Sequence, residues 1–190
     1  MDKKTIVWDV DDVLNILMEE YVLFLKSTYN IKHIDLHTNP PLIVGMNKDE
    51  YLSSLDEFRL KYYDKLIIEA TVFDWFKKYG NNFHHIALTT TPRKTADLSA
   101  KWIMRYFGDW IQSINFIFSK REDDSNVEYF KSKGEWIRWF GKVDYFIDDN
   151  EKNINEAKIL NPDLICGCPK QPWNNGISLK EILDNLNKGI

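Results

Sequence analysis

The sequence predicts an α/β fold, a three-layer Rossmann-like architecture in which a parallel sheet lies between helices. Short apolar runs recur along the chain, and segments with helical periodicity separate them. Acidic or hydroxyl residues follow directly where several of these runs end. Because strands joined by helical crossovers run parallel, these polar residues are expected together at the carboxyl edge of one sheet, where ligands bind.

Five runs are expected to form the strands of this sheet. The first is Thr5 to Trp8, a β-branched and aromatic run that ends in acidic residues. The others cover 85–88, 115–118, 143–147 and 164–166.

The segments between these runs are expected to be helical. Thr91 is expected to cap one helix, with Pro92 at its first position. The expected helices cover about 14–25, 70–79, 92–107, 135–140, 150–160 and 178–189.

Residues 15–68 contain no clear strand, and we interpret them as a small, mostly helical cap inserted over the site. Asn47 and Glu50 have the spacing of a capping box at the start of one helix. The catalytic core would then comprise residues 1–14 and 69–190.

The composition is that of an ordinary globular protein. The 190 residues are 44% hydrophobic and 28% charged, which suits one compact domain with a small insertion. The net charge of −4 gives no general attraction to the phosphate backbone, so no nucleic-acid polymer is expected as a partner. The sequence shows neither a signal peptide nor a membrane-spanning stretch, so no membrane partner is expected and the cytoplasm is the default location.

Asp9 and Asp11 follow the first expected strand and are the sharpest chemical signal. Unpaired carboxylates at the end of a buried strand are costly, and a divalent cation would compensate them. Capping of the next helix would explain one acid, for instance Asp12, but not three acids in four residues.

Asp148 and Asp149 repeat this pattern at the end of another apolar run, where a helix cap again explains only one of them. Together the two pairs predict an acidic cup at one sheet edge. Oxygen ligands of this kind suit Mg²⁺. A carboxylate nucleophile beside Mg²⁺ can form an aspartyl-phosphate, while a second acid protonates the leaving oxygen and activates water. Asp9 and Asp11 suit these two roles.

A transferring phosphoryl group also needs donors and a cation. Thr89 and Thr90, at the end of a strand and beside a helix start, are the candidate donors, although strand propensity and capping explain them equally well. Lys133 is the candidate cation, and Lys131 and Lys120 compete with it.

Other polar residues are interpreted without chemistry. His33, His37, His84 and His85 lack metal-ligand spacing with the acids and are expected in the insertion or at the surface. The loop Gln171 to Asn174 lies at the expected site edge, where it would contact substrate or simply pack a tryptophan.

These pieces, in this order, resemble the haloacid dehalogenase-like superfamily. Residues 6–14 are similar to its first motif, and Tyr145 to Asp149 resemble its fourth. Residues 86–89 and Lys133 resemble the weaker second and third motifs. The size, the short cap and the first motif are loosely similar to those of 5'(3')-deoxyribonucleotidases.

The resemblance implies a Rossmann-like core, magnesium and hydrolysis of a phosphate ester, and a helical cap over the site would favour a small phosphorylated substrate. It implies Asp9 as nucleophile, Asp11 as acid/base, and Thr89 and Lys133 as phosphoryl ligands. Metal ligation would involve Asp9, the Asp11 backbone carbonyl and Asp148, with Asp149 in support. Asp12, where many relatives have glycine, and the segment 120–132 depart from the pattern.

Three alternatives stay open to different degrees. A phosphoryl-accepting receiver domain would carry its acidic pair on the first strand, which fits poorly with the late pair Asp148 and Asp149. A calcium loop would need a glycine where Leu14 stands. A non-catalytic binding module on the same fold has no sequence feature for or against it. The oligomeric state, with a homodimer as one option, is not predicted.

Overall fold

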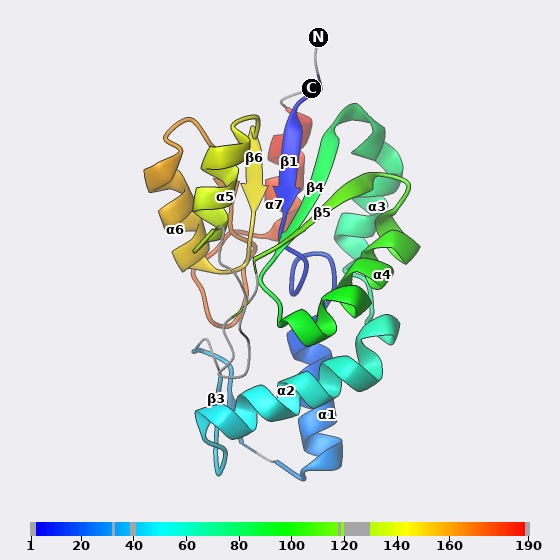
Figure 1. Cartoon of the computed structure of the whole chain (residues 1–190), viewed down its shortest axis with the longest axis vertical. Coiled ribbons are helices and arrows are strands. Elements are labelled where there is room, and N and C mark those ends of the chain that lie inside the picture. The colour runs from blue at the N-terminus through cyan, green and yellow to red at the C-terminus, as the bar shows by residue number, and fades with distance from the viewer. Residues whose placement is uncertain (1–2, 32, 39–40, 118, 120–129, 189–190) are drawn as a thin grey trace.

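The sheet of the computed structural model is parallel and five-stranded, with strand order β5-β4-β1-β6-β7. The structure describes residues 3–31, 33–38, 41–117, 119 and 130–188. It confirms the predicted α/β class (Figure 1). The strands are β1 (Thr5–Trp8), β4 (His84–Thr89), β5 (Ile111–Phe116), β6 (Tyr145–Ile147) and β7 (Ile165–Gly167).

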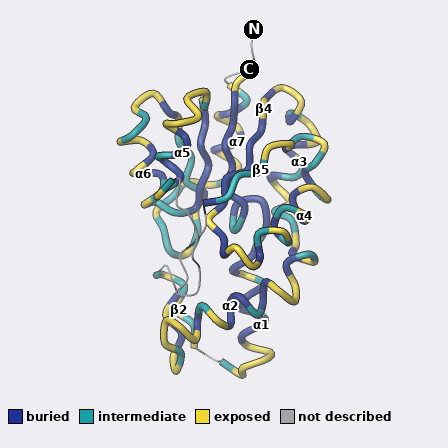
Figure 2. The backbone as a smooth tube through the Cα atoms, viewed as in Figure 1, coloured by how far each residue is buried: buried dark blue, intermediate teal, exposed yellow. Residues whose placement is uncertain are grey.

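Helices cover both faces of this sheet, because alternate residues of each strand face opposite sides. Ile6 and Trp8 of β1 pack in one core cluster with α3, α4 and α7, whereas Val7 packs in the other with α5 and α6. These helices are α3 (Ala70–Tyr79), α4 (Ala96–Phe107), α5 (Lys133–Phe140), α6 (Glu151–Leu160) and α7 (Leu179–Asn187). The central strands β1, β4 and β6 are buried almost throughout, as Figure 2 shows.

The remaining helices, α1 (Leu17–Thr28) and α2 (Lys48–Tyr62), lie beyond the carboxyl edge of the sheet (Figure 1). Between them, the two-residue strands β2 (Ile34–Asp35) and β3 (Leu42–Ile43) pair antiparallel, so the expectation of no strand in this region was wrong. Short 3₁₀ turns complete the fold: η1 (Tyr63–Lys65), η2 (Gly80–Asn82) and η3 (Arg93–Thr95).

The chain enters and leaves this region at adjacent points. Asn15 and Ile68 form an isolated antiparallel bridge, and Glu69 N donates to Leu14 O over 2.9 Å. We call residues 15–68 the α1–α2 segment. The two crossings lie at the boundaries proposed for the insertion, although its status as a separate domain stays a prediction.

The edge strand β5 differs from the predicted one. It begins at Ile111 rather than Asn115, directly after a tight turn in which Trp110 N donates to Phe107 O. Gln112 and Ser113 are exposed, because an edge strand faces solvent more than its neighbours do. These polar residues hid the start of the strand from a reading based on apolar runs.

The helix after β4 also begins later than predicted. Pro92 precedes the 3₁₀ turn η3, and α4 starts only at Ala96. Thr91 is fully buried and its hydroxyl pairs with that of Thr95, so it does not cap α4.

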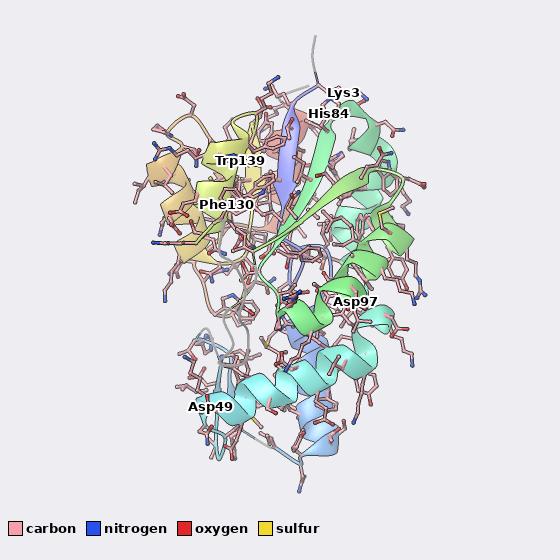
Figure 3. The ribbon with its side chains drawn as sticks, in the orientation of Figure 1. Lys3, Asp49, His84, Asp97, Phe130 and Trp139 are labelled. Carbon is pink, nitrogen blue, oxygen red and sulfur yellow. The ribbon has the colours of Figure 1, made fainter. Side chains whose placement is uncertain are left out.

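His85 lies in the core, which corrects the expectation of a surface histidine. It is 5% exposed, accepts a hydrogen bond from Trp8 Nε1 at its Nδ1, and lies 2.8 Å from Gly80 O through Nε2. Burial lowers the pKa of His85 to about 4, so the neutral ring is the stable form. His84 is exposed, at the end of the sheet far from α2 (Figure 3).

Among the described residues, no helix combines the length and the apolar character that crossing a membrane requires.

Candidate active site

Three neighbouring strands bring the predicted site residues to one edge of the sheet. Asp9 follows β1, Thr89 ends β4 and Asp148 follows β6. The backbone hydrogen bonds between β1 and β6 continue to this edge, since Asp9 N donates to Ile147 O over 2.8 Å. Parallel register therefore places residues far apart in the sequence side by side.

Lys133 joins the two acidic clusters. Its Nζ lies 2.7 Å from Asp9 Oδ2 and 2.6 Å from Asp148 Oδ2, and the residue is 3% exposed. Ser132 caps α5 by accepting from Glu135 N, which places Lys133 at the first helical position, facing the sheet. Lys131 is exposed, and Lys120 lies outside the described residues. Of the described candidates, Lys133 is thus the lysine that reaches Asp9.

Carboxylate oxygens of Asp9, Asp148 and Asp149 lie within 4.8 Å of one another. All three residues are buried, at 7%, 0% and 7% exposed. Lys133 supplies one positive charge for these three acids. The cluster therefore offers hard oxygen ligands and has less positive than negative charge. Both properties suit a divalent cation such as Mg²⁺.

The pKa values of the cluster reflect this crowding. Burial raises the pKa of Asp9 well above its ordinary range, and Asp148 and Asp149 add to the rise although Lys133 opposes it. Burial and Asp148 likewise raise the pKa of Asp149. Burial alone would lower the pKa of Lys133, but Asp148 and Asp9 more than offset it and keep the ammonium charged.

Asp148 and Asp149 have different surroundings. Asp148 accepts hydrogen bonds from Asn150 N (2.8 Å) and from Asn153 Nδ2 (3.1 and 3.0 Å) besides its contact with Lys133. Asp149 accepts from Trp173 Nε1 over 3.0 Å and lines the site cavity. Asn150, not Asp149, is the cap of α6. Asp149 is therefore the more accessible of the two acids.

Asp11 is held from outside the sheet. Its Oδ2 accepts from Arg59 Nη2 over 2.9 Å, and its Oδ1 accepts from Tyr63 Oη over 2.6 Å and from Asn15 Nδ2 over 3.2 Å. Arg59 and Tyr63 come from α2 and η1. Sequence reasoning missed both residues, because their only signal is a contact across 48 and 52 residues of chain.

Asp12 is a turn residue whose side chain faces the start of α1. Its φ of 60° is left-handed, the conformation that glycine adopts most readily, and its Oδ1 accepts from Met18 N over 2.8 Å. Asp12 is not the N-cap of α1, which begins at Leu17 with Ile16 as its cap, so the expected capping role was wrong, although the Asp12 side chain accepts a hydrogen bond from the first turn of that helix. Burial raises the pKa of Asp12 to about 8, with Asp11 and Asp9 adding to the effect.

Thr89 and Thr90 both line the cavity, with Thr89 1% exposed and Thr90 exposed. The cavity has a volume of about 200 Å³ and lies between the sheet edge and the α1–α2 segment. Predicted site residues form its core-facing wall: Asp9, Asp11, Thr89, Thr90, Lys133 and Asp149. The α1–α2 segment adds Leu17, Met18, Thr38, Pro41, Tyr51, Leu55 and Arg59.

The loop Gln171 to Asn174 supports the acidic cluster. Gln171 Nε2 donates to Asp12 O over 3.0 Å, and Asn174 Nδ2 donates to Asp149 O over 2.7 Å. Trp173, which donates to the Asp149 carboxylate, also lines the cavity. The loop thus fixes both acidic turns and places one aromatic side chain at the site.

Comparisons with known proteins support the fold. No family model and no curated protein matches the sequence. A HAD-hydrolase from Bacillus subtilis, YfnB, bound to magnesium, is 15% identical with a TM-score of 0.59, over 98% of this chain and 100% of that one. A subfamily IA HAD-superfamily hydrolase from Geobacter sulfurreducens is 14% identical (TM-score 0.57, 97% and 96% covered). A hydrolase from Streptococcus pneumoniae is 12% identical (TM-score 0.58, 98% and 100% covered).

These structures match 97–98% of the chain, and they confirm the fold that the motifs implied. The chain has the fold of the haloacid dehalogenase-like hydrolases.

Proposed function

We propose that this protein is a magnesium-dependent phosphatase that hydrolyses a small phosphomonoester through an aspartyl-phosphate on Asp9. The observation that carries the proposal is the buried cluster of Asp9, Lys133, Asp148 and Asp149 beside a cavity. A purely structural role explains it poorly, because burying three acids with one lysine is costly.

Mg²⁺ would be held by Asp9, the Asp11 backbone carbonyl, Asp148 and Asp149, and would neutralise charge on the phosphoryl oxygens. The ammonium of Lys133 and the hydroxyl of Thr89 would bind the same oxygens from the core side. These donors are buried and fixed, so little reorganisation is needed when charge develops.

Asp9 would act as the nucleophile. One of its carboxylate oxygens attacks phosphorus, a P–O bond forms and the P–O bond to the leaving group breaks. Asp11 gives a proton to the leaving oxygen. In the second step water attacks phosphorus, Asp11 takes the proton from that water, and the Asp9–phosphorus bond breaks to release inorganic phosphate.

The cavity supports a small substrate. At about 200 Å³ it is below the range of roughly 300–1,000 Å³ usual for ligand pockets. Its outer wall is mostly apolar, with Leu17, Met18 and Leu55. The loose motif resemblance makes nucleoside 5'-monophosphates the first physiological class to test, and a cytoplasmic location remains part of the proposal.

The test is hydrolysis of 4-nitrophenyl phosphate, with and without Mg²⁺, by the native protein and by Asp9→Asn. The native activity should disappear with a chelator and return with Mg²⁺. Asp9→Asn should lose on the order of 10⁴-fold in kcat, the scale seen when one member of a catalytic unit is removed.

Asp163→Asn is the matched control, because Asp163 is exposed and outside the cavity. It should retain native activity. Equal activity in Asp9→Asn and the native protein would overturn the nucleophile assignment. A stable phosphoprotein without turnover would instead favour a phosphoryl-accepting role.

A further inference from the structure

Three polar residues of the α1–α2 segment contact the segments that follow β1 and β4. Asp56 and Arg59 share a face of α2 at i and i+3, and Tyr63 follows in the 3₁₀ turn η1. We call them the α2 polar stripe. Asp56 pairs with Lys94 over 2.9 Å, whereas Arg59 and Tyr63 both donate to Asp11.

The stripe is buried, which makes its contacts specific. Asp56, Arg59 and Tyr63 are 4%, 8% and 1% exposed. Buried charges and hydroxyls are tolerated only where they find partners, so these side chains have few alternative positions. Tyr63 is fixed further by a 3.1 Å hydrogen bond to Ser99 of α4.

The core anchors the same end of the stripe. Trp102 Nε1 of α4 donates to Leu66 O over 3.0 Å, just after η1. Tyr63 therefore joins Asp11 to a helix of the core rather than to a loose surface. Arg59 additionally lines the cavity beside Asp11.

The three donors divide the two oxygens of Asp11 unequally. Oδ1 accepts from both Tyr63 and Asn15, which fills its two lone-pair sites. Oδ2 accepts only from Arg59 among the described residues, so one of its lone pairs stays available. The Asp11 carboxylate is thus held at both of its oxygens, with room at Oδ2 for one further partner.

We infer that Arg59 and Tyr63 are positioning residues that hold the Asp11 carboxylate through both of its oxygens, which makes acid/base catalysis depend on the α1–α2 segment. This inference rests on the proposed phosphatase function. Asp56 and Lys94 form the other half of the contact, which holds the α1–α2 segment against the loop after β4 without touching Asp11.

The experiment compares two substrates of similar shape, 4-nitrophenyl phosphate and phenyl phosphate. Nitrophenolate is a good leaving group without protonation, whereas phenolate is a poorer leaving group and depends more strongly on a proton from a general acid. Loss of a well-placed acid should therefore slow phenyl phosphate selectively, and general acid catalysis contributes about 10²–10⁴-fold.

In Tyr63→Phe and Arg59→Gln we expect kcat for phenyl phosphate to fall by about 10²-fold, and kcat for 4-nitrophenyl phosphate by much less. Arg59→Lys should restore part of the loss. The matched controls Asp56→Asn and Lys94→Met should raise KM for both substrates equally and leave the ratio of the two kcat values unchanged.

An equal loss on both substrates in Tyr63→Phe and Arg59→Gln would overturn the inference, because it would show a structural role alone. A crystal structure of Tyr63→Phe gives a readout independent of turnover. A displaced Asp11 carboxylate is expected, and an unchanged one would contradict the positioning role. Failure of the phosphatase proposal itself would appear separately, as absence of activity in the native protein.

Discussion

The two walls of the cavity are built in different ways. The core wall carries Asp9, Lys133 and Asp149 on strand ends and a helix start, and backbone ladders fix each position. The opposite wall carries Arg59 from α2, which reaches Asp11 only through tertiary packing. The positions of the core-wall residues are therefore fixed by the fold itself, whereas the residues of the α2 wall can change without disturbing the sheet. The difference separates acids whose positions the sheet fixes from side chains that reach the site only because the α1–α2 segment packs over it.

The largest expected effect is on the core wall, in Lys133→Met. Removing the cation leaves Asp9 and Asp148 buried without their shared partner, and breaking a buried ion pair costs about 3–5 kcal/mol in free energy of unfolding. Phosphatase activity should be lost together with that stability. Urea unfolding monitored by tryptophan fluorescence measures the first effect, and 4-nitrophenyl phosphate turnover the second.

The control is Lys131→Met, two residues away and exposed. It should leave both quantities nearly unchanged. A larger loss from Lys131→Met than from Lys133→Met would mean that the wrong lysine has been assigned.

The two walls also differ in how far the sequence predicts them. The core wall could be predicted, because Asp9 and Asp148 directly follow apolar strands and the order of the elements implies one edge. Arg59 lies in α2 and Tyr63 in η1, neither within a motif, and only tertiary packing, including that of η1 against α4, brings them to Asp11. β5 was misplaced for a related reason, since exposure of an edge strand depends on its neighbours.

A variant at His85 can show whether acid lowers the free energy of unfolding through this buried ring rather than through the carboxylates of the site. Its pKa is lowered from 6.5 to about 4 by burial, so the folded state binds its proton less readily than the unfolded chain does. The contribution of the neutral His85 ring to the free energy of unfolding is fully present above pH 6.5. It declines as the pH falls toward 4 and changes no further below pH 4. The difference amounts to about 3 kcal/mol.

The measurement is the free energy of unfolding from pH 7.5 to 4.5, in the native protein and in His85→Gln. The glutamine offers an acceptor to Trp8 and a donor to Gly80 without titrating. The native curve should fall more steeply between pH 6.5 and 4.5. Parallel curves would show that the acid sensitivity comes from other groups, for example the carboxylates of the site.

The smallest expected effect concerns the start of α2, whose cap residues do not line the cavity. Asn47 caps this helix, accepting from Asp49 N (2.9 Å) and Glu50 N (3.0 Å), and Glu50 returns a hydrogen bond to Asn47 N (2.7 Å). Asn47→Ala should cost about 1 kcal/mol in free energy of unfolding, whereas Asn47→Asp should cost little. Because the cap does not touch Arg59 or Tyr63, kcat/KM on phenyl phosphate should stay within about twofold, below the roughly tenfold change that 1.4 kcal/mol would produce. A selective loss of phenyl phosphate turnover in Asn47→Ala, at a temperature where the sheet is still folded, would show that α2 frays locally and withdraws its side chains from Asp11. The two walls would then differ in local stability as well as in chemistry.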